Sequence, residues 1–139
     1  MSGRLRREVG ALPDHDQVLA ASLRQADAIL GFAVARGDPE AQARLPRQKA
    51  SFIHAGEPQL PWLHPFSHAV TSLPLLEEAA SGNGALSFVP DGDGVVRRVP
   101  LVLRVGSTPV PTLASEALRV AQDARNIILK SAGHDSGLE

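Results

Sequence analysis

The stretch GNGALSFVPDGDGVVRRVPLVL (Gly82–Leu103) carries the clearest fold signal in the chain. Two apolar runs flank a pair of Asp-Gly dipeptides, and such dipeptides tolerate the positive φ angles that tight hairpin turns require. We therefore expect a hairpin whose strands cover residues 85–89 and 95–105. The odd-numbered side chains of the second strand are apolar except for that of Arg97. Because alternate side chains of a strand share a face, Arg97 is expected to point toward the core.

Four charged residues cluster around the turn of this hairpin: Asp91, Asp93, Arg97 and Arg98. A buried guanidinium is costly unless a carboxylate pairs with it, so we expect a structural clasp in which Arg97 binds Asp93 beside Asp91. The alternative carboxylates are Glu78 and Glu116. On this interpretation, the substitution Arg97→Ala lowers the melting temperature. The other interpretation is a site for an anionic ligand, in which Arg97 or Arg98 grips a carboxylate or a phosphate.

The composition is that of a globular protein with one domain. The 139 residues are 43% hydrophobic and 21% charged, which supplies enough apolar material for a single core. The net charge of −1 gives no basic surface for nucleic acid or an anionic membrane, and one tryptophan without any tyrosine gives no base-stacking platform. The absence of cysteine excludes disulfides, cysteine-ligated zinc and thiol catalysis. The longest apolar run, residues 28–35, is far shorter than the roughly 20 residues of a membrane helix.

Patterns along the rest of the chain predict a mixed domain. Helical spacing predicts helices over 16–26, 72–80 and 113–124, and Thr112 is expected to cap the last of them. A short apolar run predicts a strand over 28–35 that is buried on both faces, and further strands are expected at 50–54 and 126–130. The fold class is therefore α/β or α+β, with helices packed on a mixed, largely antiparallel sheet in a single domain. We place a flexible segment at 1–11, the domain at 12–130 and a flexible tail at 131–139.

The proline-rich segment 37–67 is expected to form a long loop, and such loops in compact domains are often functional. It contains Trp62, Leu63 and Phe66, which we expect to plug an edge of the core. The alternative is an exposed apolar patch that serves a partner, a dimer or a ligand lid. The candidate ligand-binding residues are Trp62 and His64 of this segment together with Arg98 of the hairpin.

Other motifs argue against catalysis and metal binding. The segment GNGALS (82–87) is close to a dinucleotide fingerprint, but it precedes a strand and is expected to be a helix stop and a turn. A calcium loop counted from Asp91 would need glutamate at its twelfth position, where Val102 stands, so only a non-standard cation site stays open. His64 and His68 flank Pro65, which disfavours the helix that would aim both at a metal. With no G-x-S-x-G elbow either, we expect no catalytic residue, no metal and no cofactor.

Taken in order, these segments resemble the CHASE sensor domain of type two. The hairpin sequence 84–101, followed by Pro111-Thr-Leu-Ala114 and Glu116-Ala-Leu-Arg119, is similar to the family pattern "pDxDGvvRrvPL" and "psLalealr". The upstream segments 12–23 and 29–32 fit as well, so the resemblance covers residues 12–121. The family normally has an earlier α/β half and flanking membrane helices. The chain therefore resembles the membrane-distal or C-terminal part of the sensor.

The resemblance implies an extracytoplasmic sensory module on the periplasmic face of the bacterial inner membrane, within a receptor such as an adenylate cyclase or a two-component histidine kinase. It implies no catalysis in this segment and supplies no binding residues. An unknown small molecule or physical signal would bias the cytoplasmic output domain. The membrane would be reached only through flanking segments, with the chain itself soluble.

The free sheet edge left by the missing half predicts a homodimer. Two other functions stay open beside the sensor. One is a stand-alone small-molecule binding protein. The other is a small hydrolase with its site in or beside the 37–67 loop and His54, His64 or His68 as base.

Overall fold

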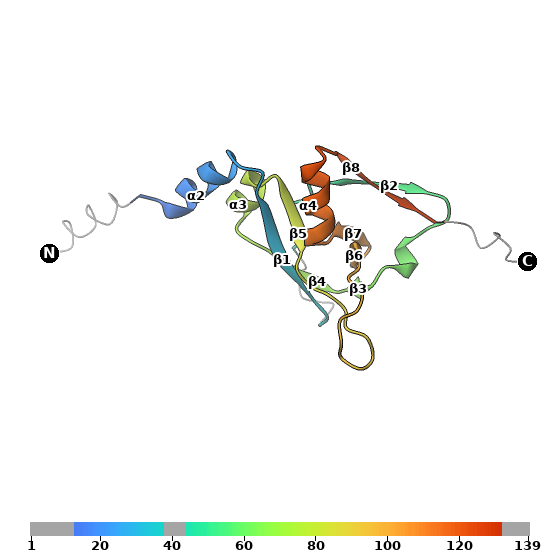
Figure 1. The fold of residues 1–139 in the computed structure, drawn as a ribbon. Helices are drawn as coiled ribbons and strands as arrows, with labels where there is room; N and C mark the ends of the chain where they lie inside the picture. Colours follow the sequence, from blue (N-terminus) through green and yellow to red (C-terminus); the bar gives the residue numbers. More distant parts are fainter. Residues whose placement is uncertain (1–12, 38–43, 132–139) are drawn as a thin grey trace, which may run out of the picture.

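The computed structural model describes residues 13–37 and 44–131, so the segment 1–11 and all of the tail except Ser131 lie outside the described residues. In chain order the elements are α2 (His15–Leu23), β1 (Ile29–Ala35), β2 (Ser51–Ala55), the 3-10 turn η1 (Leu60–Trp62), β3 (Pro65–Phe66), β4 (His68–Val70), α3 (Pro74–Ala79), β5 (Gly82–Ala85), β6 (Val102–Val105), β7 (Thr108–Pro111), α4 (Leu113–Ala121) and β8 (Asn126–Lys130). Figure 1 shows α2 and α3 at one end and the β2–β8 pair at the other. Within the described ranges no helix has the length and apolar character needed to cross a membrane.

The strands form three small sheets. In the first, β1 lies between antiparallel β4 and parallel β5, and in the second, β6 lies between parallel β3 and antiparallel β7. A parallel bridge from Ala85 to Thr112 links these two sheets. The third sheet is the parallel pair of β2 and β8. The predicted mixed single domain is confirmed, but the expected antiparallel majority is wrong, because three of the five strand pairings in the described part of the chain are parallel.

The hydrophobic core draws on both three-stranded sheets. It consists of Phe32, Val34, Ala69, Ala85, Leu103, Val105 and Val110, with Phe66 packed against them. Residues paired in register share a face, so Phe32 lies with Ala85 on the core face, and Gly31 lies with Gly84 on the opposite face, which α4 covers. That cover leaves Ala33 exposed. The prediction that this strand is buried on both faces is therefore wrong.

The glycines of β5 allow α4 to approach the sheet closely. A Cβ atom added at Gly84 would lie 2.6 Å from the Cα atom of Leu113, and one at Gly82 would lie 2.7 Å from Oε1 of Glu116. A larger residue at position 84 would force the backbone of α4 to shift, and one at position 82 would displace the side chain of Glu116. The segment 82–84 follows the end of α3 as predicted, but it is a fully buried strand and not a turn.

The long connection from β5 to β6, residues 86–101 (the β5–β6 loop), replaces most of the predicted hairpin. β5 ends at Ala85 and β6 begins at Val102, so the strands expected at 85–89 and 95–105 are wrong over most of their length. The loop leaves the body of the domain (Figure 1), where its alternating side chains have no core to face. Six of its apolar side chains are 40–64% exposed: Leu86, Phe88, Val95, Val96, Val99 and Leu101.

Hydrogen bonds tie both ends of this loop to the body. The hydroxyl of Ser87 accepts a hydrogen bond from the N–H of Val34 (3.0 Å) and lies 3.3 Å from its carbonyl oxygen. The carbonyl of Leu101 accepts from the N–H and the hydroxyl of Thr112 (3.0 and 3.2 Å) and from the hydroxyl of Ser115 (2.6 Å). Thr112 therefore occupies the predicted N-cap position of α4 but uses its hydroxyl to hold the loop. Between these two anchors, residues 88–100 form no strand.

The remaining elements follow local sequence signals to different degrees. The helix predicted at 16–26 is α2, capped by the carboxylate of Asp14, which accepts from the N–H groups of Asp16 and Gln17. The strand predicted at 126–130 is β8, and the one at 50–54 is β2, shifted by one residue. The helix predicted at 72–80 is α3, which begins after Leu73. The short strands β3 and β7 escaped prediction because they contain prolines, and β4 because it is only three residues long.

Candidate functional site

The tip of the β5–β6 loop holds the four charged residues together. Arg97 forms a two-pronged ion pair with Asp93 (2.9 and 2.8 Å) and lies 3.4 Å from a carboxylate oxygen of Asp91. Arg98 lies 2.9 Å from the other oxygen of Asp91. The expected partner of Arg97 is thus beside it, but the expectation that Arg97 is buried is wrong, because its side chain is 55% exposed. The strand that would have turned it inward does not form.

The ion pair at the tip shifts the titration of both partners. Hydrogen bonds from Arg97, assisted by the N–H of Val95, hold the pKa of Asp93 below its usual value. The same carboxylate, with Asp91, raises the pKa of Arg97. The pair is therefore ionised throughout the physiological pH range. Because both side chains are more than half exposed, water screens it and its contribution to global stability is small.

The substitution Arg97→Ala is expected to return the pKa of Asp93 toward its usual value, because its largest perturbing contact is removed. Asp93 has a lowered pKa in the folded protein, so its pairing stabilises the loop at neutral pH and is lost as the pH falls through that pKa. A carboxylate NMR titration of both proteins measures the change. Arg98→Ala is the control, since Arg98 contacts Asp91 instead. The melting temperature is expected to stay nearly the same. A marked decrease would support the hypothesis that Arg97 and Asp93 form a buried pair.

A cavity of about 240 Å³ lies beside this tip. It is lined by His64, Val89, Pro90, Asp91, Arg98, Val99 and Pro100. The structure therefore brings together two of the three candidate ligand-binding residues. His64 directly precedes β3, and Arg98 lies on the β5–β6 loop. The side chain of Arg98 is 85% exposed, whereas that of Asp91 is 25% exposed. The cavity thus combines the ion pair of Arg98 and Asp91 and the imidazole of His64 with apolar walls.

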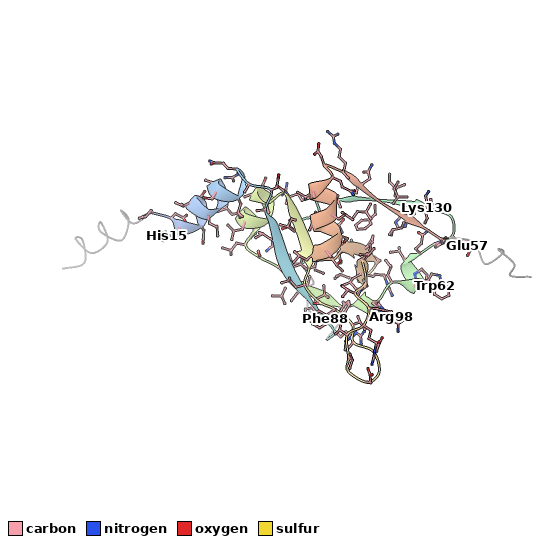
Figure 2. The ribbon with its side chains drawn as sticks, in the orientation of Figure 1. His15, Glu57, Trp62, Phe88, Arg98 and Lys130 are labelled. Carbon is pink, nitrogen blue, oxygen red and sulfur yellow. The ribbon has the colours of Figure 1, made fainter. Side chains whose placement is uncertain are left out.

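Trp62, the third candidate, does not line this cavity. Its side chain is 85% exposed on the turn η1, whereas Arg98 and Phe88 lie on the β5–β6 loop (Figure 2). The prediction that Trp62 plugs the core is therefore wrong. Phe66 does reach the core, because β3 pairs with β6 and places Phe66 beside Val105. The guanidinium of Arg36 lies 5.3 Å from the centre of the Phe66 ring.

A buried ion pair joins Glu116 and Arg119, one turn apart on α4. Both carboxylate oxygens of Glu116 accept from Arg119 (2.8 and 2.9 Å), and the two side chains are 0% and 10% exposed. Arg119 also donates to the carbonyl oxygens of Ser81 (3.0 Å) and Ala124 (2.7 Å). The hydrogen bonds that Arg119 donates to Glu116 outweigh burial and raise the pKa of Arg119. This pair connects α4 to the start of β5 and to the segment that leads into β8.

Sequence reasoning missed this pair. Helical spacing predicted an apolar stripe on α4, and Glu116 entered only as an alternative partner for Arg97. In the structure Glu116 is the one fully buried residue among those of α4. The sequence signal for the pair is the three-residue spacing of Glu116 and Arg119 on a helix. In the structure, the missing side chain of Gly82 leaves room for the carboxylate of Glu116.

The histidines proposed as catalytic bases lie on different elements. His54, on β2, has its Nδ1 atom 2.9 Å from Oε1 of Gln59, and His68 lies on β4, whereas His64 lines the cavity. Within residues 13–37 and 44–131 no group of three or more histidine, aspartate or glutamate side chains could hold a metal ion. Of the three histidines, His64 is the one that lines the cavity with Asp91 and Arg98.

Comparison with known proteins identifies a family over nearly the whole chain. Residues 3–137 match the CHASE2 domain, which includes the stretch from Gly84 to Arg119 on which the resemblance was based. Searches of curated proteins and of solved structures gave no match. The family assignment therefore rests on sequence, and the resemblance stated above is confirmed. The chain belongs to the CHASE2 domain family, whose members are extracellular sensory domains and not catalysts.

Proposed function

We propose that this chain is the extracytoplasmic sensory segment of a bacterial transmembrane receptor, in which it biases a linked cytoplasmic cyclase or kinase domain. Membership of a sensory family supports the role. The observation that carries it is the cavity between the two halves of the β5–β6 loop. Its lining takes Pro90 and Asp91 from the outgoing half and Arg98 and Val99 from the returning half. A molecule bound there touches both halves at once.

The loop is the part of the domain whose position a small signal can change. A signal shifts an equilibrium only through its different affinity for two arrangements. The loop is anchored at Ser87 and Leu101, and between these anchors exposed ion pairs hold its halves together. Because exposed ion pairs are weak, the free energy of binding at the cavity is large enough to compete with them. The anchor at Leu101 then passes the change to α4 through Thr112 and Ser115.

The location is tested with a single cysteine in the full receptor. The chain has no cysteine, so Ser107→Cys introduces one reactive thiol on the exposed β6–β7 turn. A maleimide that does not cross the inner membrane is expected to label it in intact spheroplasts. The matched control is a cysteine in the output domain, which should react only after lysis. Labelling of Ser107→Cys only after lysis would contradict the proposed location.

The signalling role is tested by the output of the membrane-embedded receptor. Replacing residues 91–96 by two glycines removes the charged tip and shortens the loop. We expect the basal output activity of the receptor to change and its response to signal to be lost. The control variant is Gly92→Ala, because a Cβ atom there meets no heavy atom within 4 Å. An unchanged output in the shortened receptor would argue against the loop as its signalling element.

We further propose that the segment forms a homodimer through β8. In the described part of the chain β2 and β8 pair only with each other, and a two-stranded sheet is marginal by itself. The N–H of Ser51 donates to Arg125 and that of Ser131 donates to Ala55. Since alternate residues of a parallel strand bond to the same neighbour, Ile128 and the residues two positions to either side present their backbone groups on the open edge. Antiparallel pairing about Ile128, which is 57% exposed, places Lys130 opposite Asn126 of the second copy, so no like charges meet.

The substitution Ile128→Pro is expected to convert the dimer to a monomer, because proline removes the N–H that would pair across the dimer axis. Sedimentation over a range of concentrations measures the result. Ile128→Val keeps both the N–H and the strand propensity, and should remain dimeric. A wild-type chain that is monomeric at the highest concentration, or an Ile128→Pro variant that still dimerises, would contradict this interface.

A further inference from the structure

We infer that the cavity beside the β5–β6 loop binds a small carboxylate with a short apolar body, and that this ligand takes Arg98 away from Asp91. The inference deepens the proposed function and rests on it only for the statement that the cavity receives a signal. The ligand chemistry follows from the size, the walls and the charges of the cavity, one after another.

The size and walls set the ligand's body. The volume of about 240 Å³ lies below that of pockets for drug-sized molecules, which begin at about 300 Å³. The walls are formed by Val89, Pro90, Val99 and Pro100, whose side chains offer no hydrogen bonds. A ligand that fits them has a body of a few carbon atoms.

The charges set the ligand's head group. Arg98 offers a planar fork of N–H donors that matches a carboxylate, and His64 adds an imidazole nitrogen. Asp91 shares the cavity and repels anions, so a group with one negative charge is favoured over a doubly charged phosphate. The 85% exposure of Arg98 leaves its side chain free to turn toward the ligand. A monocarboxylate thus satisfies the donors at the smallest electrostatic cost.

The ligand can take Arg98 without stranding a carboxylate. Asp91 is the less exposed partner of this ion pair, and its second oxygen lies 3.4 Å from Arg97. Arg97 in turn keeps its two contacts with Asp93. When Arg98 turns to the ligand, Asp91 therefore remains paired. The direct link between Asp91 on the outgoing half and Arg98 on the returning half is broken, which is how binding would move the loop.

The test is an NMR titration of the whole chain with butyrate. Butyramide serves as the neutral isostere, butylammonium as the cation and inorganic phosphate as the doubly charged anion. The signals followed are the backbone amides of Val89, Asp91, Arg98 and Val99 and the imidazole of His64. We expect saturable shifts with butyrate, none with butyramide or butylammonium, and weaker binding of phosphate.

Three variants assign the roles of the charged residues. Arg98→Gln is expected to weaken butyrate binding by at least about tenfold, because a charged hydrogen bond is lost. Asp91→Asn is expected to strengthen it by up to about fivefold, since the competing exposed ion pair and the repulsion disappear. Arg24→Gln is the matched control, because Arg24 is exposed after α2 and does not line the cavity, and it should leave the affinity unchanged.

The outcomes separate this inference from the proposed function. Absence of saturable shifts with butyrate, equal binding by Arg98→Gln, weaker binding by Asp91→Asn, or tighter binding of phosphate would each overturn the carboxylate site. Those results would leave the thiol labelling and the output of the loop-shortened receptor unaffected. Conversely, a receptor with the segment on the cytoplasmic side would refute the proposed function while butyrate binding stood.

Discussion

Replacing Glu116 by alanine is expected to destabilise the domain more than any other change to a charged residue. The side chain of Glu116 is fully buried and holds Arg119, whose side chain is only 10% exposed. Removing one partner of a buried pair leaves an uncompensated charge, which costs about 3–5 kcal/mol. Because the free energy of unfolding of such domains is about 5–15 kcal/mol, the substitution removes a large part of the stability. Urea unfolding at neutral pH measures the loss, and the melting temperature should fall by roughly 10–20 °C.

Two further variants decide whether the buried charge is the cause. The double substitution Glu116→Leu with Arg119→Met removes both charges and is expected to recover most of the lost stability, because apolar side chains of similar size can replace a buried pair. Asp93→Ala breaks an ion pair of similar geometry that is exposed, and should leave the unfolding midpoint nearly unchanged. If Glu116→Ala and Asp93→Ala destabilise to the same degree, burial is not what makes the α4 pair important.

These two ion pairs show how far charge patterns lead. The spacing of Asp91, Asp93 and Arg97 places them within reach of one another, and the structure has them in contact. Their burial could not be predicted in the same way, because it depends on a strand that does not form. Glu116 and Arg119 are equally close in sequence, yet their burial depends on the glycines of β5, which are more than thirty residues away. Pairing is local, whereas burial is decided by the rest of the fold.

The same distinction explains which elements could be predicted. α2 and β8 follow from a capping aspartate and a short apolar run, which act within a few residues. β5 reads Gly-Asn-Gly-Ala, a poor strand sequence by propensity. It is a strand because β1 pairs with it and because α4 packs so closely on it that only glycine fits at positions 82 and 84. Neither cause is visible in the segment itself.

The candidate site was predicted in part. Arg98 and His64 were chosen from separate segments, one for excess charge and one for its place in a proline-rich loop, and the cavity unites them. Trp62 is predicted either to plug the core or to lie in an exposed apolar patch, and its side chain is 85% exposed outside the cavity. The apolar walls of the cavity were not foreseen, because Val89 and Val99 were assigned to strands and not to the loop.

Leucine to alanine changes at positions 101 and 103 are expected to differ widely in effect. Period-two alternation predicts that both side chains face the core. In the structure Leu103 is 0% exposed within the core cluster, whereas Leu101 is 64% exposed at the end of the β5–β6 loop. Leu103→Ala is expected to cost about 2–5 kcal/mol, from lost burial and the cavity left behind. Leu101→Ala should cost less than about 1 kcal/mol, because most of its side chain is in water in the folded state.

The pair of variants makes the same chemical change two residues apart, so each is the control for the other. Urea unfolding of both, with equal slopes, isolates the difference in free energy. The backbone carbonyl of Leu101 is its contact with Thr112 and Ser115, and alanine keeps that carbonyl. Loss of stability in Leu101→Ala therefore has only its side chain as a source. A cost similar to that of Leu103→Ala would mean that the alternation extends back into the loop, and that the second strand begins before Val102.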